Sequence, residues 1–239
     1  MPTQTGSLTY NGSAQSPTWS GYDASKMTLG GTTSSTNAGS HTATFTPKAN
    51  YQWSGGGTSG KSAVWTIGRA TISTVPSQSG SLTYTGSPQS PSWSNYDSGK
   101  MTLGGTHSAT NAGSYQATFT PTANYQWSGG GTGGKNVSWS IGKAAGSLTL
   151  NRASLTLNNS TKSGTITVTR PGDGVVTASS NNNGIAKVSV SGTTVTVTAI
   201  AYGSATITVN VAAGTNHTAP SSKTCAVTVN LFNATLNYN

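Results

Sequence analysis

A glycine-rich segment in the first third of the chain has the spacing of a phosphate-binding loop. The segment SGGGTSGKSAVW contains Gly55, four further residues, and then Gly60, Lys61 and Ser62, which fits G-x-x-x-x-G-K-[ST]. Such a loop binds nucleotide phosphates when a helix N-terminus follows it and an acid on a neighbouring strand helps to hold Mg²⁺. Here the alternation in SAVWTIG predicts a strand, and the later segment GGGTGGKNVSW carries Asn136 in place of Ser62. We therefore interpret the segment as a flexible glycine-rich hairpin loop.

The histidines lack the partners that a metal site or a catalytic triad requires. The chain has three of them. His41 and His107 are replaced by Tyr115 and Thr33 at the corresponding positions of the internal repeat described below, and His217 stands alone in GTNHTAP. Transition metals need several converging nitrogen or sulfur ligands, and a triad needs a histidine paired with an acid. We expect no metal site and no triad.

The single cysteine, Cys225, alternates with Val227 and Val229. This pattern predicts a buried, inert thiol rather than a reactive one. With one cysteine in the chain, no intrachain disulfide is possible.

Carboxylates are scarce. The chain contains three acids, Asp23, Asp97 and Asp173, and no glutamate. Asp23 and Asp97 occur in GYDASKM and NYDSGKM, and an aspartate followed by small residues is typical of a turn. Assistance of a Lys–Asn isopeptide cross-link is the alternative role for these two residues. With so few acids and no histidine paired with them, we expect no enzyme activity and no cofactor.

Positive charge is spread along the chain. The 12 lysines and arginines never form a run, whereas nucleic-acid binders concentrate their charge on one stripe. We therefore expect no nucleic-acid partner. Diffuse attraction to an acidic partner, such as a capsid shell or an anionic wall polymer, stays open. No apolar run is long enough to span a membrane, so we expect no membrane insertion.

Six aromatic residues are candidates for contact with glycans. Two pairs lie in the polar, turn-rich segments PTWSGYD and PSWSNYD, and two tryptophans precede the glycine-rich loops in NYQWSGGG. Exposed rings on a β-scaffold can stack on sugar faces. The alternative is that these rings cap the open ends of a sandwich. The candidates are Trp19, Tyr22, Trp93, Tyr96, Trp53 and Trp127.

The elements that position these residues are arranged in a tandem repeat. Residues 2–70 (the first repeat) recur as residues 76–144 (the second repeat), with Gly6 corresponding to Gly80 and about 50 of 69 aligned positions identical. Within each copy, apolar residues alternate with polar ones as in a half-buried strand, for example Val137, Trp139 and Ile141 in KNVSWSIG. The composition, poor in helix formers, predicts essentially no helix.

Residues 146–230 (the C-terminal domain) have a different composition, rich in threonine and valine. Ser191-Gly192 predicts a tight turn between two strands. Seven short alternating strands favour an immunoglobulin-type β-sandwich. We therefore predict an all-β protein of three tandem immunoglobulin-like β-sandwich domains, followed by a tail at 231–239. The predicted strands of the C-terminal domain are Ser154–Asn158, Gly164–Thr169, Val175–Ser179, Ile185–Val190, Thr193–Ala199, Gly203–Val211 and Lys223–Val229.

The C-terminal domain resembles the bacterial immunoglobulin-like group 2 domains. The resemblance is carried by the paired SLTL opening, by IAKVSVSGTTVTVTAIAYGSATITV and by the closing CAVTV. The two repeats are similar to another bacterial immunoglobulin-like module, through LTYNGSAQSPTWSGYD, TNAGSHTATFTPKANYQW and the final WTIG. Such modules occur on bacterial surface proteins and on the virions of tailed phages. The resemblance implies an adhesive or structural role and brings no catalytic residues.

Two locations follow from the resemblance. MPTQTGSLTY has neither the basic segment nor the apolar core of a secretion signal, which favours a tailed-phage virion over a cell surface. On a virion we expect several copies on the head or tail, contacts with other virion proteins, and weak binding of host or mucus polysaccharide. The tail at 231–239 is our candidate for the particle anchor. The alternative is a spacer or adhesin region of a Gram-positive surface protein.

Overall fold

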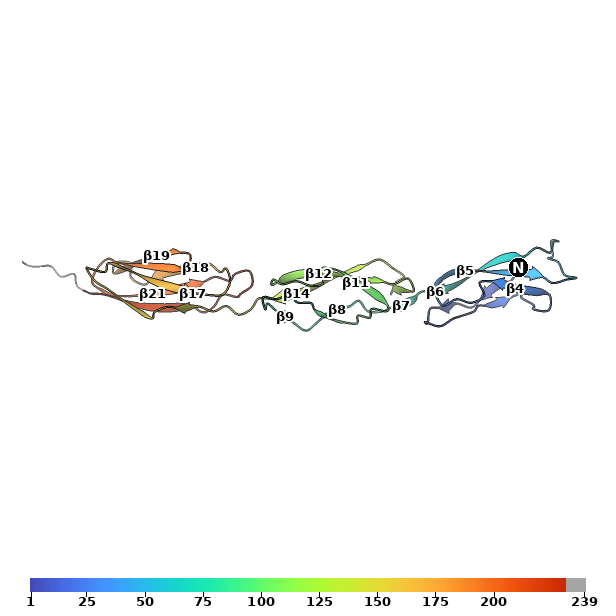
Figure 1. The fold of residues 1–239 in the computed structure, drawn as a ribbon, viewed down its shortest axis with the longest axis horizontal. Coiled ribbons are helices and arrows are strands. Elements are labelled where there is room, and N and C mark those ends of the chain that lie inside the picture. Colours follow the sequence, from blue (N-terminus) through green and yellow to red (C-terminus); the bar gives the residue numbers. More distant parts are fainter. Residues whose placement is uncertain (231–239) are drawn as a thin grey trace, which may run out of the picture. The chain divides into compact units, whose positions relative to one another are not determined.

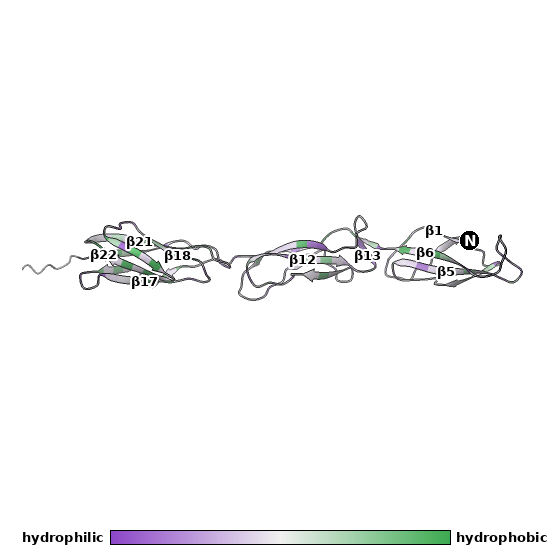
Figure 2. Ribbon diagram, turned by 90° about the horizontal axis from the view of Figure 1, so that it is seen from above, coloured by the Kyte–Doolittle hydropathy of each residue, from purple (hydrophilic) through white to green (hydrophobic). Residues whose placement is uncertain are grey.

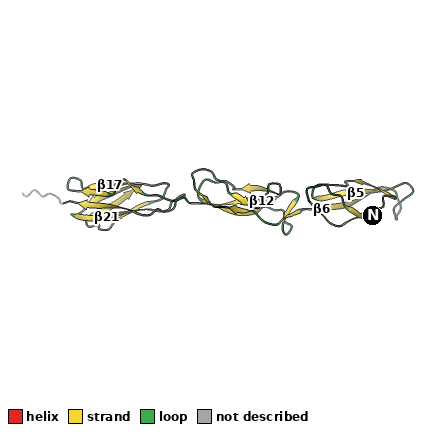
Figure 3. Ribbon diagram, turned by 90° about the horizontal axis from the view of Figure 1, so that it is seen from below, coloured by secondary structure: helices red, strands yellow, loops and turns green. Residues whose placement is uncertain are grey.

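The computed structural model describes residues 1–230, which form 22 strands and no helix (Figure 3). The predicted all-β class and the sandwich architecture are confirmed. Nothing in this described part could cross a membrane as a long apolar helix. The predicted particle anchor at 231–239 lies outside the described residues.

The chain divides into two compact units. The first consists of Met1–Ser79, Pro91–His107 and Tyr115–Trp139, and the second of Gly80–Ser90, Ser108–Ser114 and the described residues from Ser140 onward. This division does not follow the repeats, because the second repeat contributes to both units. The boundaries of the three domains therefore stay a prediction.

The first repeat is a four-stranded sheet with a separate two-stranded ladder. The larger sheet has the order β2-β6-β5-β4 and the ladder is β1-β3 (Figure 1). A further strand, β7, follows the repeat. The bounds are β1 Thr3–Thr5, β2 Leu8–Thr9, β3 Thr18–Ser20, β4 Met27–Gly31, β5 Gly39–Pro47, β6 Lys61–Gly68 and β7 Ala70–Ile72.

The second repeat has the same two sheets, ordered β11-β12-β14-β9 and β10-β8. It has in addition β13, which pairs in parallel with β7. The bounds are β8 Ser77–Ser79, β9 Leu82–Thr83, β10 Ser92–Ser94, β11 Met101–Gly105, β12 Gly113–Pro121, β13 Tyr125–Trp127 and β14 Lys135–Gly142.

The C-terminal domain contains two four-stranded sheets, β15-β17-β20-β19 and β16-β22-β21-β18. All seven predicted strands are present, and the last two match the prediction to the residue. The predicted turn is shifted by one residue, because Ser191 still pairs with Thr194 and the loop is Gly192-Thr193. The bounds are β15 Thr149–Leu150, β16 Ser154–Leu157, β17 Ser163–Thr169, β18 Val176–Ser180, β19 Ala186–Ser191, β20 Thr194–Ala199, β21 Gly203–Val211 and β22 Lys223–Val229.

Alternation along the strands builds each core. In β6, Trp65 and Ile67 are buried while Val64 and Thr66 beside them are exposed, as the alternation in the sequence predicts. The Trp65 Nε1 donates to the Thr32 carbonyl at 2.7 Å, so the buried indole keeps its hydrogen bond. In the C-terminal domain the same alternation is visible along β21 and β22 (Figure 2).

Candidate functional site

The glycine-rich loop of the first repeat folds back on a tryptophan. It connects β5 to β6, which pair antiparallel, so the predicted hairpin is confirmed. Lys61 is the first residue of β6, and its Nζ lies 5.2 Å from the centre of the Trp53 ring. The Trp53 Nε1 donates to the Ser59 carbonyl at 2.9 Å. A strand stands where a phosphate-binding loop needs a helix, so the backbone N–H groups that would surround a phosphate are not arranged for it.

The first and last glycines of the loop motif, Gly55 and Gly60, differ in the space around them, and substitution can test this difference. A Cβ at Gly60 would lie 2.8 Å from Thr46 Oγ1 and 3.0 Å from Thr44 Cγ2, whereas a Cβ at Gly55 would meet no atom within 4 Å. We expect Gly60→Ala to lower the free energy of unfolding by about 1 kcal/mol, because the loop must shift to admit the methyl group. Gly55→Ala is the matched control and should change it little. Equal effects in urea titrations would contradict the close approach at Gly60.

Four of the six candidate glycan-binding aromatics pack against core phenylalanines. The Trp19 and Phe45 rings meet edge to face with centroids 4.9 Å apart, and Tyr22 lies 5.4 Å from the same ring. Trp19 belongs to β3, which corrects its predicted place in a turn-rich stretch: β3 pairs with β1, and the indole completes the core. These rings are half-buried, and glycan contact through their free edges stays a prediction. The second repeat has the same arrangement, with Trp93 in β10 and Tyr96 at 4.9 and 5.5 Å from Phe119.

The remaining two candidates, Trp53 and Trp127, differ although the surrounding residues NYQWSGGG are identical. Trp127 is 2% exposed, while Trp53 is half-buried. Each has a lysine over its ring, Lys135 at 5.0 Å from the Trp127 centroid and Lys61 over Trp53. A glycan could reach the Trp53 ring, whereas the Trp127 ring is enclosed.

Two of the three histidines pack against aromatic rings, while His107 is exposed and hydrogen-bonds to the Gly105 carbonyl at 3.1 Å. His41 lies against the Trp65 ring at a centroid distance of 4.6 Å, and Tyr115 takes the same place against Trp139 at 4.8 Å. This equivalence explains why tyrosine replaces histidine between the repeats. His217 packs edge to face on Tyr84 at 5.5 Å. Among residues 1–230, no group of three or more His, Cys, Asp or Glu side chains is placed to hold a metal ion.

The three aspartates stabilise turns and loops. Asp23 Oδ1 accepts from the backbone N–H of Ser25 at 2.9 Å and from its hydroxyl at 2.6 Å. Asp23 Oδ2 lies 3.0 Å from Lys26 Nζ. Asp97 is bonded in the same manner to the Gly99 N–H, which supports the turn-forming reading of these two residues. Asp173 accepts from the backbone N–H and the hydroxyl of Thr215 at 2.8 and 2.6 Å.

These bonds predict a simple acid dependence of stability. The Ser25 hydroxyl, with Lys26 and the Ser25 N–H, lowers the pKa of Asp23 from 3.8 to about 2, and hydrogen bonds also lower the pKa of Asp97 and Asp173. Because the folded pKa values are depressed, their stabilising effect is complete above pH 3.8 and is lost as the pH falls toward about 2. We expect the melting temperature to fall over that window. The chain has no glutamate, so a variant with Asn at all three aspartate positions should have a melting temperature that changes little with pH in this window. If the variant lost stability on acidification as the unmodified chain does, the aspartates would not be the cause.

Cys225 is fully buried, as predicted. Burial raises the pKa of its thiol, which disfavours the reactive thiolate. The side chain faces the core of the C-terminal domain, among valines of β21 and β22.

A hollow in the first unit has about 620 Å³ and a polar lining. Arg69 is its only ionisable residue, and the Arg69 Nε donates to the Ala123 carbonyl at 3.0 Å. General acid–base catalysis needs a titratable group near neutrality, and this hollow supplies none. Its other lining residues are Ser7, Leu8, Thr9, Gly39, Ser40, Thr66, Ile67, Gly68, Thr71 and Gln126.

An asparagine that the sequence analysis did not single out joins the two repeats within the first unit. Asn124 Oδ1 accepts from the Ala38 backbone N–H at 2.8 Å, and its Nδ2 donates to Asn37 Oδ1 at 3.2 Å. The Asn124 carbonyl accepts from the Ala70 N–H at 2.9 Å. Three bonds from one residue thus reach the turn at Asn37 and Ala38 in the first repeat and β7, the strand that follows that repeat.

The second unit repeats this junction with another asparagine. Asn216 Oδ1 accepts from the Ala112 N–H at 2.8 Å, and its Nδ2 donates to Asn111 Oδ1 at 3.1 Å. The Asn216 carbonyl accepts from the Ala144 N–H at 2.9 Å. We call Asn124 and Asn216 the junction asparagines. The signal available in the sequence was the turn TNAG, present in both repeats.

No family model matches the sequence, and no relative is found among curated proteins. Several solved structures are similar. Domains 4 and 5 of the S-layer protein SbsC match at 21% identity and a TM-score of 0.29, over 49% of this chain and 65% of that one. Domains 4–9 of SbsC match at 17% identity and a TM-score of 0.32, over 83% and 26%.

A third similar structure is SGBP-B of a Bacteroides ovatus mixed-linkage glucan utilization locus, in complex with a mixed-linkage heptasaccharide. It matches at 12% identity and a TM-score of 0.20, over 96% of this chain and 66% of that one. The chain spans less than two thirds of the length of all three structures. At these TM-scores the likenesses say nothing about what this chain binds.

Proposed function

We propose that the chain is a structural and adhesive protein without enzymatic activity, an array of immunoglobulin-like domains displayed outside the cell. The observation that carries this proposal is the repeated junction, in which Asn124 and Asn216 make the same bonds to the repeat before them. Junctions with the same hydrogen bonds suit a chain that carries several weak binding surfaces, because such surfaces act together through avidity.

The chemistry of the ionisable groups supports a non-catalytic role. Asp23 and Asp97 are bonded within their turns, Asp173 is bonded to Thr215 of another loop, and the one cysteine is buried. Activated nucleophiles and general bases are instead found next to one another at accessible sites.

The finer proposal is a virion protein of a tailed phage, present in several copies on the head or tail and bound to other virion proteins. Its support is the sequence resemblance of the C-terminal domain to the bacterial immunoglobulin-like group 2 domains. Antibodies against the purified chain should label purified phage particles in electron micrographs. Labelling of uninfected Gram-positive cell walls instead would favour the alternative, a spacer or adhesin region of a cell-surface protein, and would overturn the virion location.

Polysaccharide binding through the half-buried aromatics is the adhesive part of the proposal. Tyr22 and Tyr96 keep an exposed part while packing on Phe45 and Phe119. A variant with Tyr22→Ala and Tyr96→Ala should lose retention on immobilised host-wall polysaccharide. Tyr202→Ala is the control, because Tyr202 is 63% exposed and is not a candidate. Circular dichroism verifies folding, and full retention by the folded double variant would overturn glycan contact at these rings.

A further inference from the structure

The two repeats differ in burial at positions where their sequences agree. Trp127 and Met101 of the second repeat are 2% and 1% exposed. Their counterparts in the first repeat, Trp53 and Met27, are only half-buried. The segments ANYQWSGGG and KMTLGG around these positions are identical in both repeats, so local sequence does not explain the difference.

These residues of the second repeat are buried by β7, the strand that follows the first repeat. β7 pairs in parallel with β13, with Ala70 opposite Tyr125 and Ile72 opposite Trp127. The Ile72 carbonyl accepts from the Ser128 N–H at 2.9 Å, and the Ile72 side chain is 7% exposed. Within the first unit, β7 therefore pairs with the edge of the second repeat and shields Met101 and Trp127 of that repeat from water.

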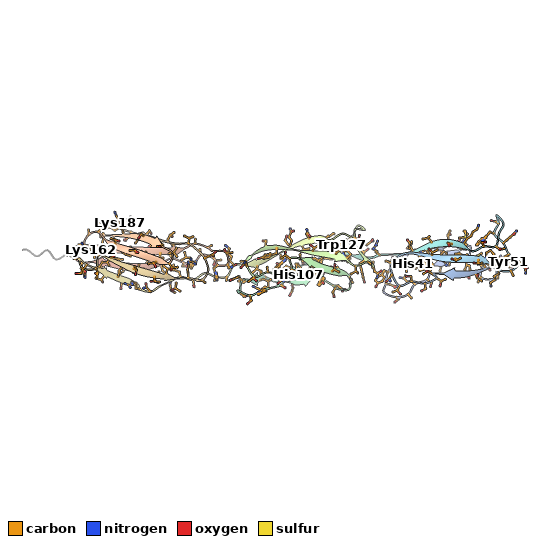
Figure 4. All side chains as sticks on the ribbon, turned by 45° about the horizontal axis from the view of Figure 1, so that its top comes forward. His41, Tyr51, His107, Trp127, Lys162 and Lys187 are labelled. Atoms are coloured by element: carbon orange, nitrogen blue, oxygen red, sulfur yellow. The ribbon has the colours of Figure 1, made fainter. Side chains whose placement is uncertain are left out.

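Within residues 1–230, no strand pairs with the same segment of the first repeat. Residues 51–53 form no strand, whereas β13 does. Tyr51 is 43% exposed, while its counterpart Tyr125 packs on Tyr10 at 5.4 Å. In Figure 4, Tyr51 and His41 lie at opposite ends of the first repeat. Asn50, the counterpart of Asn124, is exposed and takes a left-handed φ of 70°.

We propose that this end of the first repeat is a docking surface for the strand that follows another repeat of the same class, as β7 follows the first repeat. The uncovered face, defined as Met27, Pro47, Asn50, Tyr51 and Trp53, would receive a strand of the type basic-Ala-Thr-Ile, as Arg69–Ile72 supplies to the second repeat. Strand addition provides backbone hydrogen bonds, and the aliphatic residue fills the apolar part of the face. The Asn50 carbonyl then accepts from the N–H of the alanine in that strand, as the Asn124 carbonyl accepts from the Ala70 N–H.

The second junction, between the second repeat and the C-terminal domain, supports the choice of occupant. Ala144 forms a parallel bridge with His217, and the Thr218 N–H donates to the Ala144 carbonyl at 2.9 Å. The C-terminal domain thus receives the end of the second repeat in the same parallel sense, although its sequence is different. In both units the segment that ends a repeat pairs in parallel with the domain that follows, as a strand in the first unit and as a single bridge in the second.

The test extends the full chain by a copy of Gly68–Val75 placed before Pro2, in the position of Met1. Hydrogen exchange read by mass spectrometry distinguishes KANYQWS of the first repeat from TANYQWS of the second. We expect the amides of residues 51–53 to exchange at least about tenfold more slowly than in the chain without the extension. Their rate should approach that of β13 in the same molecule. The same extension with aspartate in place of its isoleucine is the control and should give no protection.

Two outcomes overturn the proposal: unchanged exchange at residues 51–53 in the folded extended chain, or equal protection by the aspartate control. This inference is independent of where the protein is displayed and of any glycan. Its failure would leave the virion and adhesive proposals untouched.

Discussion

Trp65→Ala is expected to unfold the first repeat while the C-terminal domain keeps its structure. Trp65 is fully buried, and the buried residues beside it in this core are Ala43, Phe45 and Ile67. Removing a buried tryptophan costs about 3–5 kcal/mol, and a domain of this size has a similar total stability. The loss also leaves the Thr32 carbonyl without the indole N–H.

The neighbouring residue supplies the control. Val64 lies on the opposite face of β6 and is 64% exposed. Val64→Ala should change the free energy of unfolding by less than about 0.5 kcal/mol. Amide signals of the first repeat, followed by NMR during urea titration, separate its transition from that of the C-terminal domain. If both substitutions shifted the transition equally, the inward packing of β6 would not be what holds the repeat together.

The long strands could be predicted because each buries one face. Gly203–Val211 and Lys223–Val229 alternate over seven residues or more, and the structure reproduces their predicted bounds. Two-residue strands such as β15 are too short to show a period, and their pairing depends on a partner distant in sequence. The predicted turn at Ser191-Gly192 missed by one residue for a related reason, since the last pair of the ladder decides where the loop begins.

The burial of the candidate aromatics could not be read from local sequence. Trp53 and Trp127 have identical neighbours, yet one is half-buried and the other enclosed, because β7 covers only the second. Pairing with β7 likewise decides whether the Tyr-Gln-Trp segment forms a strand, as it does at Tyr125–Trp127 and does not at residues 51–53. Trp19 looked like a turn residue from its proline and serines, but pairing of β3 with β1 directs its ring onto Phe45.

Asn124→Gly is expected to weaken the junction of the two repeats. It removes the bonds from the Ala38 N–H and to Asn37 Oδ1, and their loss should lower the free energy of unfolding by about 2 kcal/mol. The Ala38 N–H is left half-buried without its acceptor, which adds to the cost. Asn37→Ala removes only the second bond and should produce about half of the loss.

Asn50→Gly is the matched control for this substitution. Asn50 occupies the same place in an identical ANYQW segment, and among the described residues it has no counterpart of the two junction bonds. Its φ of 70° suits glycine, so the control should be neutral or slightly stabilising. Differential scanning calorimetry of the three variants measures the difference. Equal destabilisation by Asn124→Gly and Asn50→Gly would mean that the asparagine stabilises its own loop and not the junction, and the feature on which the proposed function rests would be lost.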